Sequence, residues 1–311
     1  MFKLALQIDT QLIEKGVPPH ARPFQAGITI AESLGAGVIL GSEFFAKIDA
    51  IYKKLYRHSD LVIPPMHIGA FMFRDVFFPL RIPVIYGVRA INPVDLLLDA
   101  TDFQKKWLFD DKETGLSLFD QVIDLMDFIY GLDDFEKVSS SERTKELWFL
   151  ARRQLEAGAA AILGSFDVYS VIQNSCIATE LLLKGALSEK TGMTDKQLKD
   201  KYGHEIKNLS SEVASILSEA DGERLLSVVQ KLPHYTKSRY YDIQNPKSPY
   251  FDAKAFSRQK VGELLMNTQF IAGEILRQFS DRDTRSRLTA NASNPDWNFT
   301  QRVFPSRSQT K

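Results

Sequence analysis

The stretch FDVYSVIQNSCIATELLLKGAL, residues 166–187, decides the fold that the sequence predicts. Its apolar residues recur at the three- and four-residue spacing of an α-helix and describe one broad buried face. They are Val168, Ile172, Cys176, Ile177, Leu181, Leu183 and Leu187. Glu180 precedes Lys184 by one turn, in the order that favours an ion pair along a helix. The stretch therefore predicts a core helix with two opposite charges at the edge of its apolar face.

Helical patterns on both sides of this stretch extend the prediction to a bundle. The stripe before it consists of Trp148, Ala151, Leu155, Ala159 and Ile162. Gly164 and Ser165 break that pattern, so two consecutive antiparallel helices are expected. Amphipathic patterns continue after it, and Gly203 places His204 at the start of one of these helices rather than in its interior. The fold class we expect is mainly α.

The first part of the chain is also expected to be mostly helical, but with a few short strands. Residues 41–56 carry a clear helical pattern. The runs LVIPP, residues 61–65, and RIPVIYGV, residues 81–88, are β-prone and bounded by proline, and they flank the aromatic segment AFMFRDVFFPL. Within that segment, the adjacent charges Arg74 and Asp75 are expected to be a paired structural set.

Changes in composition predict three parts. The run DDFEKVSSSE, residues 133–142, is polar and rich in serine, and we take it as a domain boundary. Residues 1–140 then form an N-terminal domain or extension of unknown role, and residues 141–280 form a helical bundle. Residues 281–311 are rich in Arg, Ser, Thr and Asn and contain few core-forming side chains, which predicts a flexible basic tail.

The totals exclude several classes of function. The 311 residues include 39 basic and 39 acidic side chains, so the chain has no net field that would attract nucleic acid or an anionic membrane. No apolar run reaches the length of a membrane helix, and no membrane partner is expected. The single Cys176 excludes an intramolecular disulfide and favours a reduced, cytoplasmic setting. The five histidines lack metal-ligand spacing, and neither a metal nor a cofactor is predicted.

Three separated motifs then follow one another in a recognisable order. They are ATELLLKGAL at residues 178–187, YGHEIKNL at residues 202–209 and SRYYD at residues 238–242, with a long closing helix after them. This order resembles the HEPN domain, whose members show a helix with Glu-x-x-x-Lys, a Gly-His before an amphipathic helix and an Arg-Tyr-Pro-Asp-like segment. The resemblance covers roughly residues 143–280. Tyr241 stands here where relatives often have proline.

The resemblance implies a helical bundle, often paired as a homodimer, in defence, toxin–antitoxin or regulatory systems. The matched residues predict a pocket for the phosphate of a nucleotide or RNA. Its predicted ligand-binding residues are Lys184, His204, Lys207, Arg239 and Tyr240, and the predicted structural residues are Glu180 and Asp242. A purely structural role for all of these charges, as pairs that lock helices together, is the alternative.

Three functions remain open at this point. The first is the nucleotide- or RNA-phosphate-binding module. The second is a metal-independent endoribonuclease, with His204 and Arg239 as candidate catalytic residues. The ribonuclease branch of the family carries Arg followed four to six residues later by His, and this sequence lacks that pattern. The third is a non-catalytic, dimerising module that binds a partner protein.

Overall fold

The computed structural model describes residues 1–85, 91–97, 99–138, 141–217, 220–233 and 256–284. The described chain is mainly helical, as the sequence predicts, and it forms two compact units, Met1–Pro64 and Pro65–Lys311. The predicted basic tail lies outside the described residues from residue 285 onward. No helix in the described ranges has both the length and the apolar character needed to span a bilayer.

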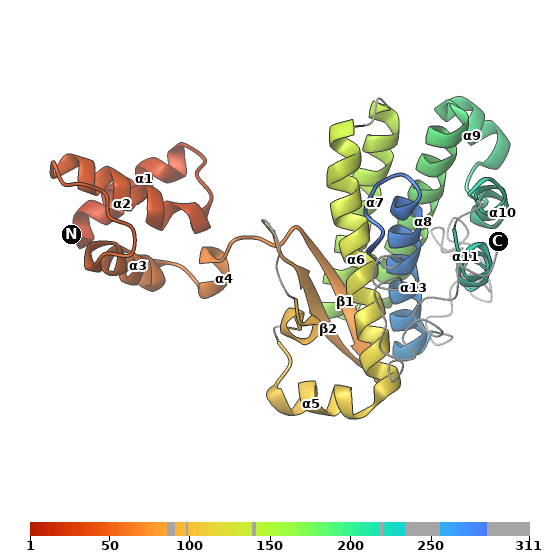
Figure 1. Cartoon of the computed structure of the whole chain (residues 1–311), viewed down its shortest axis with the longest axis horizontal. Helices are drawn as coiled ribbons and strands as arrows, with labels where there is room; N and C mark the ends of the chain where they lie inside the picture. The colour runs from red at the N-terminus through yellow and green to blue at the C-terminus, as the bar shows by residue number, and fades with distance from the viewer. Residues whose placement is uncertain (86–90, 98, 139–140, 218–219, 234–255, 285–311) are drawn as a thin grey trace, which may run out of the picture. The chain divides into compact units, whose positions relative to one another are not determined.

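The first unit, Met1–Pro64, is a small helical bundle, drawn in red and orange in Figure 1. Its elements are α1 (Phe2–Glu14), the 3₁₀ turn η1 (Pro19–Ala21), α2 (Arg22–Ser33), α3 (Glu43–Leu55) and α4 (His58–Leu61). The helix predicted at residues 41–56 is α3. Apolar side chains of the three longer helices form its core, which consists of Ala5, Ile8, Leu12, Ala26, Ile30, Ile48 and Tyr52.

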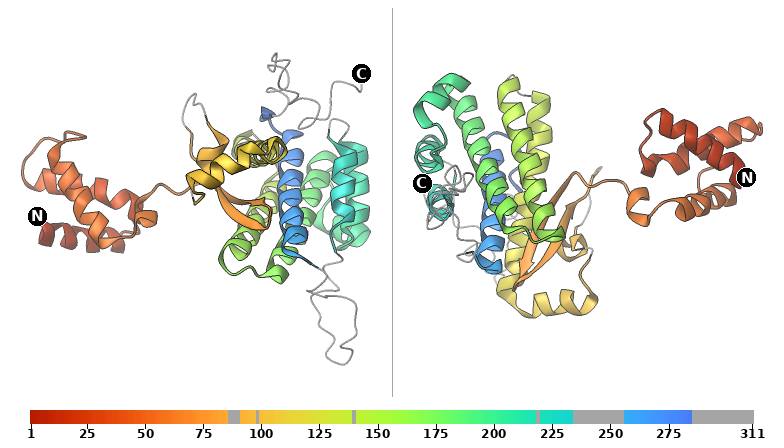
Figure 2. Two further views of the ribbon diagram at one scale, coloured as in Figure 1. Left: turned by 90° about the horizontal axis from the view of Figure 1, so that it is seen from below. Right: turned by 180° about the vertical axis from the view of Figure 1, so that it is seen from behind.

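The second unit combines one hairpin with a bundle of long helices (Figure 1). The hairpin consists of β1 (His67–Phe73) and β2 (Val76–Ile82). The helices that follow are η2 (Pro93–Leu96), α5 (Asp102–Asp110), α6 (Lys112–Val138), α7 (Glu142–Gly164), α8 (Val168–Thr191), α9 (Asp195–Tyr202), α10 (Ile206–Ile216), α11 (Gly222–Gln230) and α13 (Arg258–Arg277). The views of Figure 2 show α7, α8 and α13 side by side, with α10 and α11 outside them.

The hairpin covers the aromatic segment, residues 70–80, and includes the first two residues of the predicted run 81–88. The other predicted run, residues 61–65, contains no strand. Phe73 pairs with Val76, so Arg74 and Asp75 form its two-residue turn, and Arg74 has a positive φ of 59°. The two charges are thus turn residues, and the Arg74 guanidinium lies 4.1 Å from the ring centre of Trp107. On α13, Gln269 accepts from the Ala70 N–H at 2.8 Å and donates to the Ala70 carbonyl at 2.9 Å. This amide ties the sheet edge to the bundle.

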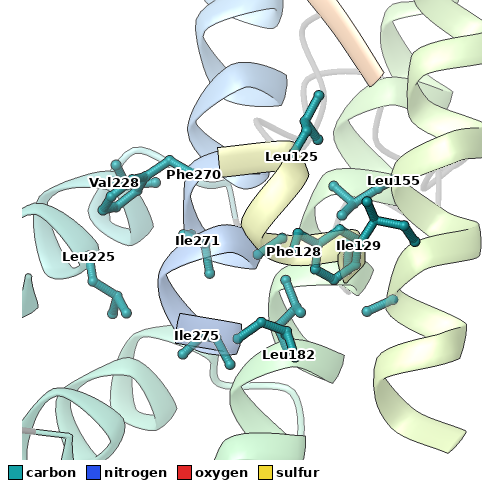
Figure 3. Packing of buried hydrophobic residues seen from close by; sticks show 14 of the residues in the cluster. Leu125, Phe128, Ile129, Leu155, Leu182, Leu225, Val228, Phe270, Ile271 and Ile275 are labelled. Atoms are coloured by element: carbon teal, nitrogen blue, oxygen red, sulfur yellow. The ribbon is translucent and has the colours of Figure 1, made fainter. Parts of the chain in front are cut away.

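The core of the second unit lies where five helices converge. Figure 3 shows Leu125, Phe128 and Ile129 of α6 among side chains of α7, α8, α11 and α13. Close helix packing depends on glycine, because a Cβ at Gly185 would lie 2.3 Å from Nε1 of the buried Trp148. That nitrogen donates to the Leu182 carbonyl at 3.1 Å.

The unit boundary at Pro64 differs from the predicted boundary near residue 140. The helices α6 and α7, on either side of residue 140, belong to one core. The rings of Phe135 on α6 and Trp148 on α7 lie 4.5 Å apart, edge to face. Residues 133–138 of the serine-rich run belong to the end of α6, and residue 142 begins α7.

Candidate functional site

The charges at the border of α8 meet the turn between α9 and α10. Lys184 Nζ lies 2.7 Å from Glu180 Oε1 and 2.7 Å from the Gly203 carbonyl oxygen. His204 Nδ1 lies 3.1 Å from each Glu180 oxygen. The structure thus brings together three of the residues predicted for the site, with the Glu180 carboxylate at their centre.

Local sequence fixes the position of His204. Helix α9 ends at Tyr202, and Gly203 follows with a positive φ of 54°, a backbone conformation that glycine adopts without strain. Tyr202 and Ile206 are buried on either side of the turn and anchor it to the bundle. The side chain of His204 between them is 57% exposed, whereas that of Glu180 is only 8% exposed. One edge of the imidazole therefore faces a buried carboxylate while most of the ring is accessible to solvent.

Helix α10 begins at Ile206, two residues after His204. Its N-cap residue, Glu205, makes no capping hydrogen bond through its side chain, and the first turn contains no acidic residue. The first N–H groups of an α-helix lack intrahelical acceptors and carry the positive end of the helix dipole. Lys207, in that first turn, is exposed and adds a positive charge. The Ile206 N–H already donates to the His204 carbonyl at 3.0 Å, so this end of α10 offers an anion the N–H groups of Lys207 and Asn208 and the Lys207 charge, against the negative charge of Glu205.

A cavity of about 30 Å³ lies beside this turn. It is lined by His204, Glu205, Ile206, Lys207, Val229, Leu232 and Pro233. Its volume is close to that of one water molecule. A larger ligand would therefore rest over the helix end and place only a small group in the cavity.

On the interior side of the site, the buried thiol of Cys176 lies near the Glu180 carboxylate. One turn before Glu180 on α8, the Cys176 thiol lies within 3.7 Å of the Pro233 carbonyl oxygen. Burial and then the nearby Glu180 carboxylate raise the pKa of this thiol to about 12. Cys176 is thus a protonated packing side chain at neutral pH, and it supplies no nucleophile.

Of the remaining predicted residues, only Lys207 lies in the described part of the chain. Lys207 lies on the exposed first turn of α10, beside His204. Arg239, Tyr240 and Asp242 fall outside the described residues, so their predicted roles stay predictions. The Gly203 carbonyl, which accepts from Lys184, had no signal in the sequence beyond the glycine itself.

Two further charged clusters lie inside the second unit, and sequence reasoning missed both. The fully buried guanidinium of Arg277 donates to Asp124 at 2.5 Å, to Asp127 at 2.7 Å and to Glu274 at 2.9 Å. Burial raises the pKa of Asp127 despite the neighbouring Arg277.

The second cluster lies at the start of β1. The buried His67 places Nδ1 3.1 Å from Glu156 Oε1, and Arg152 also pairs with that carboxylate, at 3.2 Å. Burial lowers the pKa of His67, against the opposing effect of Glu156. Across the described part of the chain, no three His, Cys, Asp or Glu side chains are placed together as metal ligands.

Comparison of the chain with protein-family models, with curated proteins and with solved structures found no match.

Proposed function

We propose that the second unit is a HEPN-like module that binds the phosphate of a nucleotide or RNA at the N-terminus of α10. The proposal is supported above all by one arrangement, in which Glu180 holds His204 beside the end of α10, where Lys207 offsets the charge of the N-cap residue Glu205. Lys207 and the first-turn N–H groups supply positive charge and hydrogen-bond donors, the groups that phosphate oxygens accept from.

The roles of the matched residues differ in this proposal. Lys184 neutralises the Glu180 carboxylate and holds the Gly203 carbonyl, so it fixes the turn and does not contact the ligand. His204 and Lys207 contact the phosphate from the solvent side. By the family resemblance, Arg239 and Tyr240 add a second cation and a stacking surface for a base.

Equilibrium titration with ATP, GTP and a short single-stranded RNA tests this function. Replacing Lys207 with alanine removes one charge-assisted contact and should weaken binding about tenfold. Lys199→Ala, which removes an exposed lysine of α9, is the matched control and should leave the affinity unchanged. Binding that is absent from the parent chain, or that falls equally in both variants, would contradict the proposal.

A metal-independent endoribonuclease is the second candidate, and the contact between Glu180 and His204 favours it. A carboxylate on Nδ1 fixes the tautomer of an imidazole and leaves Nε2 on the side away from it, as in other histidine general bases. The missing Arg-to-His pattern counts against this function. Incubation with RNA in EDTA tests it, and activity must fall in His204→Ala and in Glu180→Gln. Cleavage that survives both changes would exclude this dyad.

A further inference from the structure

Helix α1 of the first unit carries an exposed apolar stripe that the core of this unit does not use. Phe2, Leu6 and Ile13 of α1 are 47%, 38% and 51% exposed. At about 3.6 residues per turn, they lie within about 40° of one another around the helix axis. Asp9, the remaining position of the same four-three-four spacing, turns inward and accepts from the Tyr56 hydroxyl at 2.5 Å. The stripe therefore has the spacing of a helix–helix seam without a partner helix in the described unit.

Two exposed charges beside this stripe have the signs that the dipole of α1 disfavours. Lys3 lies in the first turn of α1 and Glu14 in the last, and both are exposed. The helix dipole favours the opposite arrangement, with an anion near the N-terminus and a cation near the C-terminus. Eleven residues separate them, about 16 Å along the axis, so they cannot pair within one helix. Their placement is thus unfavourable in an isolated α1.

Both charges flank the stripe on the same side, and this makes the face complementary to itself. We propose that α1 packs antiparallel against α1 of a second copy of this chain. A two-fold axis near the middle of the helix then buries Phe2, Leu6 and Ile13 of both copies against one another. It also brings Lys3 of each copy to Glu14 of the other, so the same arrangement that is unfavourable in one helix provides two ion pairs between helices.

This interface lies on the first unit, and it is independent of the phosphate site on the second. Loss of phosphate binding would leave it untouched, and a monomeric chain would leave the phosphate site untouched.

Charge reversal on the full chain, followed by sedimentation equilibrium, tests the pairing. Lys3→Glu or Glu14→Lys alone places like charges opposite each other twice, and each should raise the dimer dissociation constant about tenfold or more. Both changes improve the match to the helix dipole, so circular dichroism should show no loss of helix. An equimolar mixture of the two variants restores opposite charges at both contacts and should recover the dimer.

Two apolar variants complete the design. Leu6→Glu should make the chain monomeric, because it places a charge at the centre of the seam. Ile39→Glu is the matched control, since Ile39 is 69% exposed in the same unit but lies in the loop after α2. A parent chain that is monomeric at its highest soluble concentration would overturn the proposal. So would a dimer that survives Leu6→Glu, or a mixture of charge variants that stays dissociated.

Discussion

Removal of the Arg277 guanidinium tests how the bundle tolerates charge in its interior. The Arg277→Met change keeps an apolar chain of similar length and removes only the charged group. The guanidinium has no exposed surface, and it joins α13 to α6 through Asp124 and Asp127. Glu274, one turn earlier on α13, accepts from the same group. The variant therefore leaves three buried carboxylates without their shared cation.

The expected loss of stability is large. Removing one partner of a buried ion pair costs about 3–5 kcal/mol, because the charge that remains is neither solvated nor paired. A typical domain has a total stability of about 5–15 kcal/mol, so Arg277→Met removes about a fifth of it or more. Replacing Asp124 and Asp127 with asparagine in the same chain removes two of the stranded charges. That triple variant should regain part of the loss, although its amides need new hydrogen-bond partners.

The loss should depend on pH in a direction that follows from burial. Burial already raises the pKa of Asp127 with Arg277 present, and removal of the cation raises it further. A carboxyl group with a raised pKa in the folded state stabilises the fold when protonated, and this contribution is lost as the pH rises through the folded pKa. The difference in the free energy of unfolding between variant and parent should therefore become smaller as the pH falls from about 7 towards about 4.

Urea unfolding followed by circular dichroism at several pH values measures both effects. A variant within about 1 kcal/mol of the parent at neutral pH would refute the account of the buried carboxylates. A gap that stays constant with pH would also refute it, since the loss would then come from packing alone.

The remaining predictions concern three buried positions. Burial lowers the pKa of His67 below its ordinary value of 6.5, so the parent should lose stability as the pH falls below that value. In urea unfolding over the same pH range, His67→Phe should lose less stability than the parent. Gly185→Ala should cost about 1–3 kcal/mol, because its Cβ would overlap the Trp148 ring, whereas Gly164→Ala, with open space around it, should be neutral or stabilising in thermal melts. The thiol of Cys176, whose pKa burial raises to about 12, should resist alkylation near pH 8 until urea unfolds the chain. Rapid labelling of the native protein would contradict its burial.

The long helices could be predicted because their apolar residues repeat on one face over several turns. The stripe from Trp148 to Ile162 and the stretch from Phe166 to Leu187 correspond to α7 and α8, which pack antiparallel. The hairpin is harder to predict from the sequence, because both of its faces contact other side chains and the segment lacks a clear alternation of apolar and polar residues. Its turn carries Arg74 with a positive φ rather than the glycine or asparagine that normally signals such a turn.

The candidate site could be predicted only as far as its contacts are local in sequence. Glu180 and Lys184 lie one helical turn apart, and their spacing predicts the pair that the structure contains. The contact of Glu180 with His204 crosses 24 positions, and no spacing rule reaches that far. The cluster around Arg277 joins residues about 150 positions apart, and it depends on how α6 and α13 pack. Arg277 in the sequence resembles any basic residue in the last turn of a helix.

The two ion-pair clusters differ in how far their charged groups are exposed to solvent. Around Arg277, the guanidinium and the carboxylates that face it have almost no exposed surface, so no ligand can reach them. Around Glu180, the carboxylate is buried and Lys184 is partly buried, but His204 exposes more than half of its side chain to solvent at the end of α10. A buried carboxylate stabilises the fold weakly at best, since its desolvation offsets its pairing. Under the proposed function, its contribution is to hold an exposed imidazole at a fixed orientation, which binding or catalysis would require.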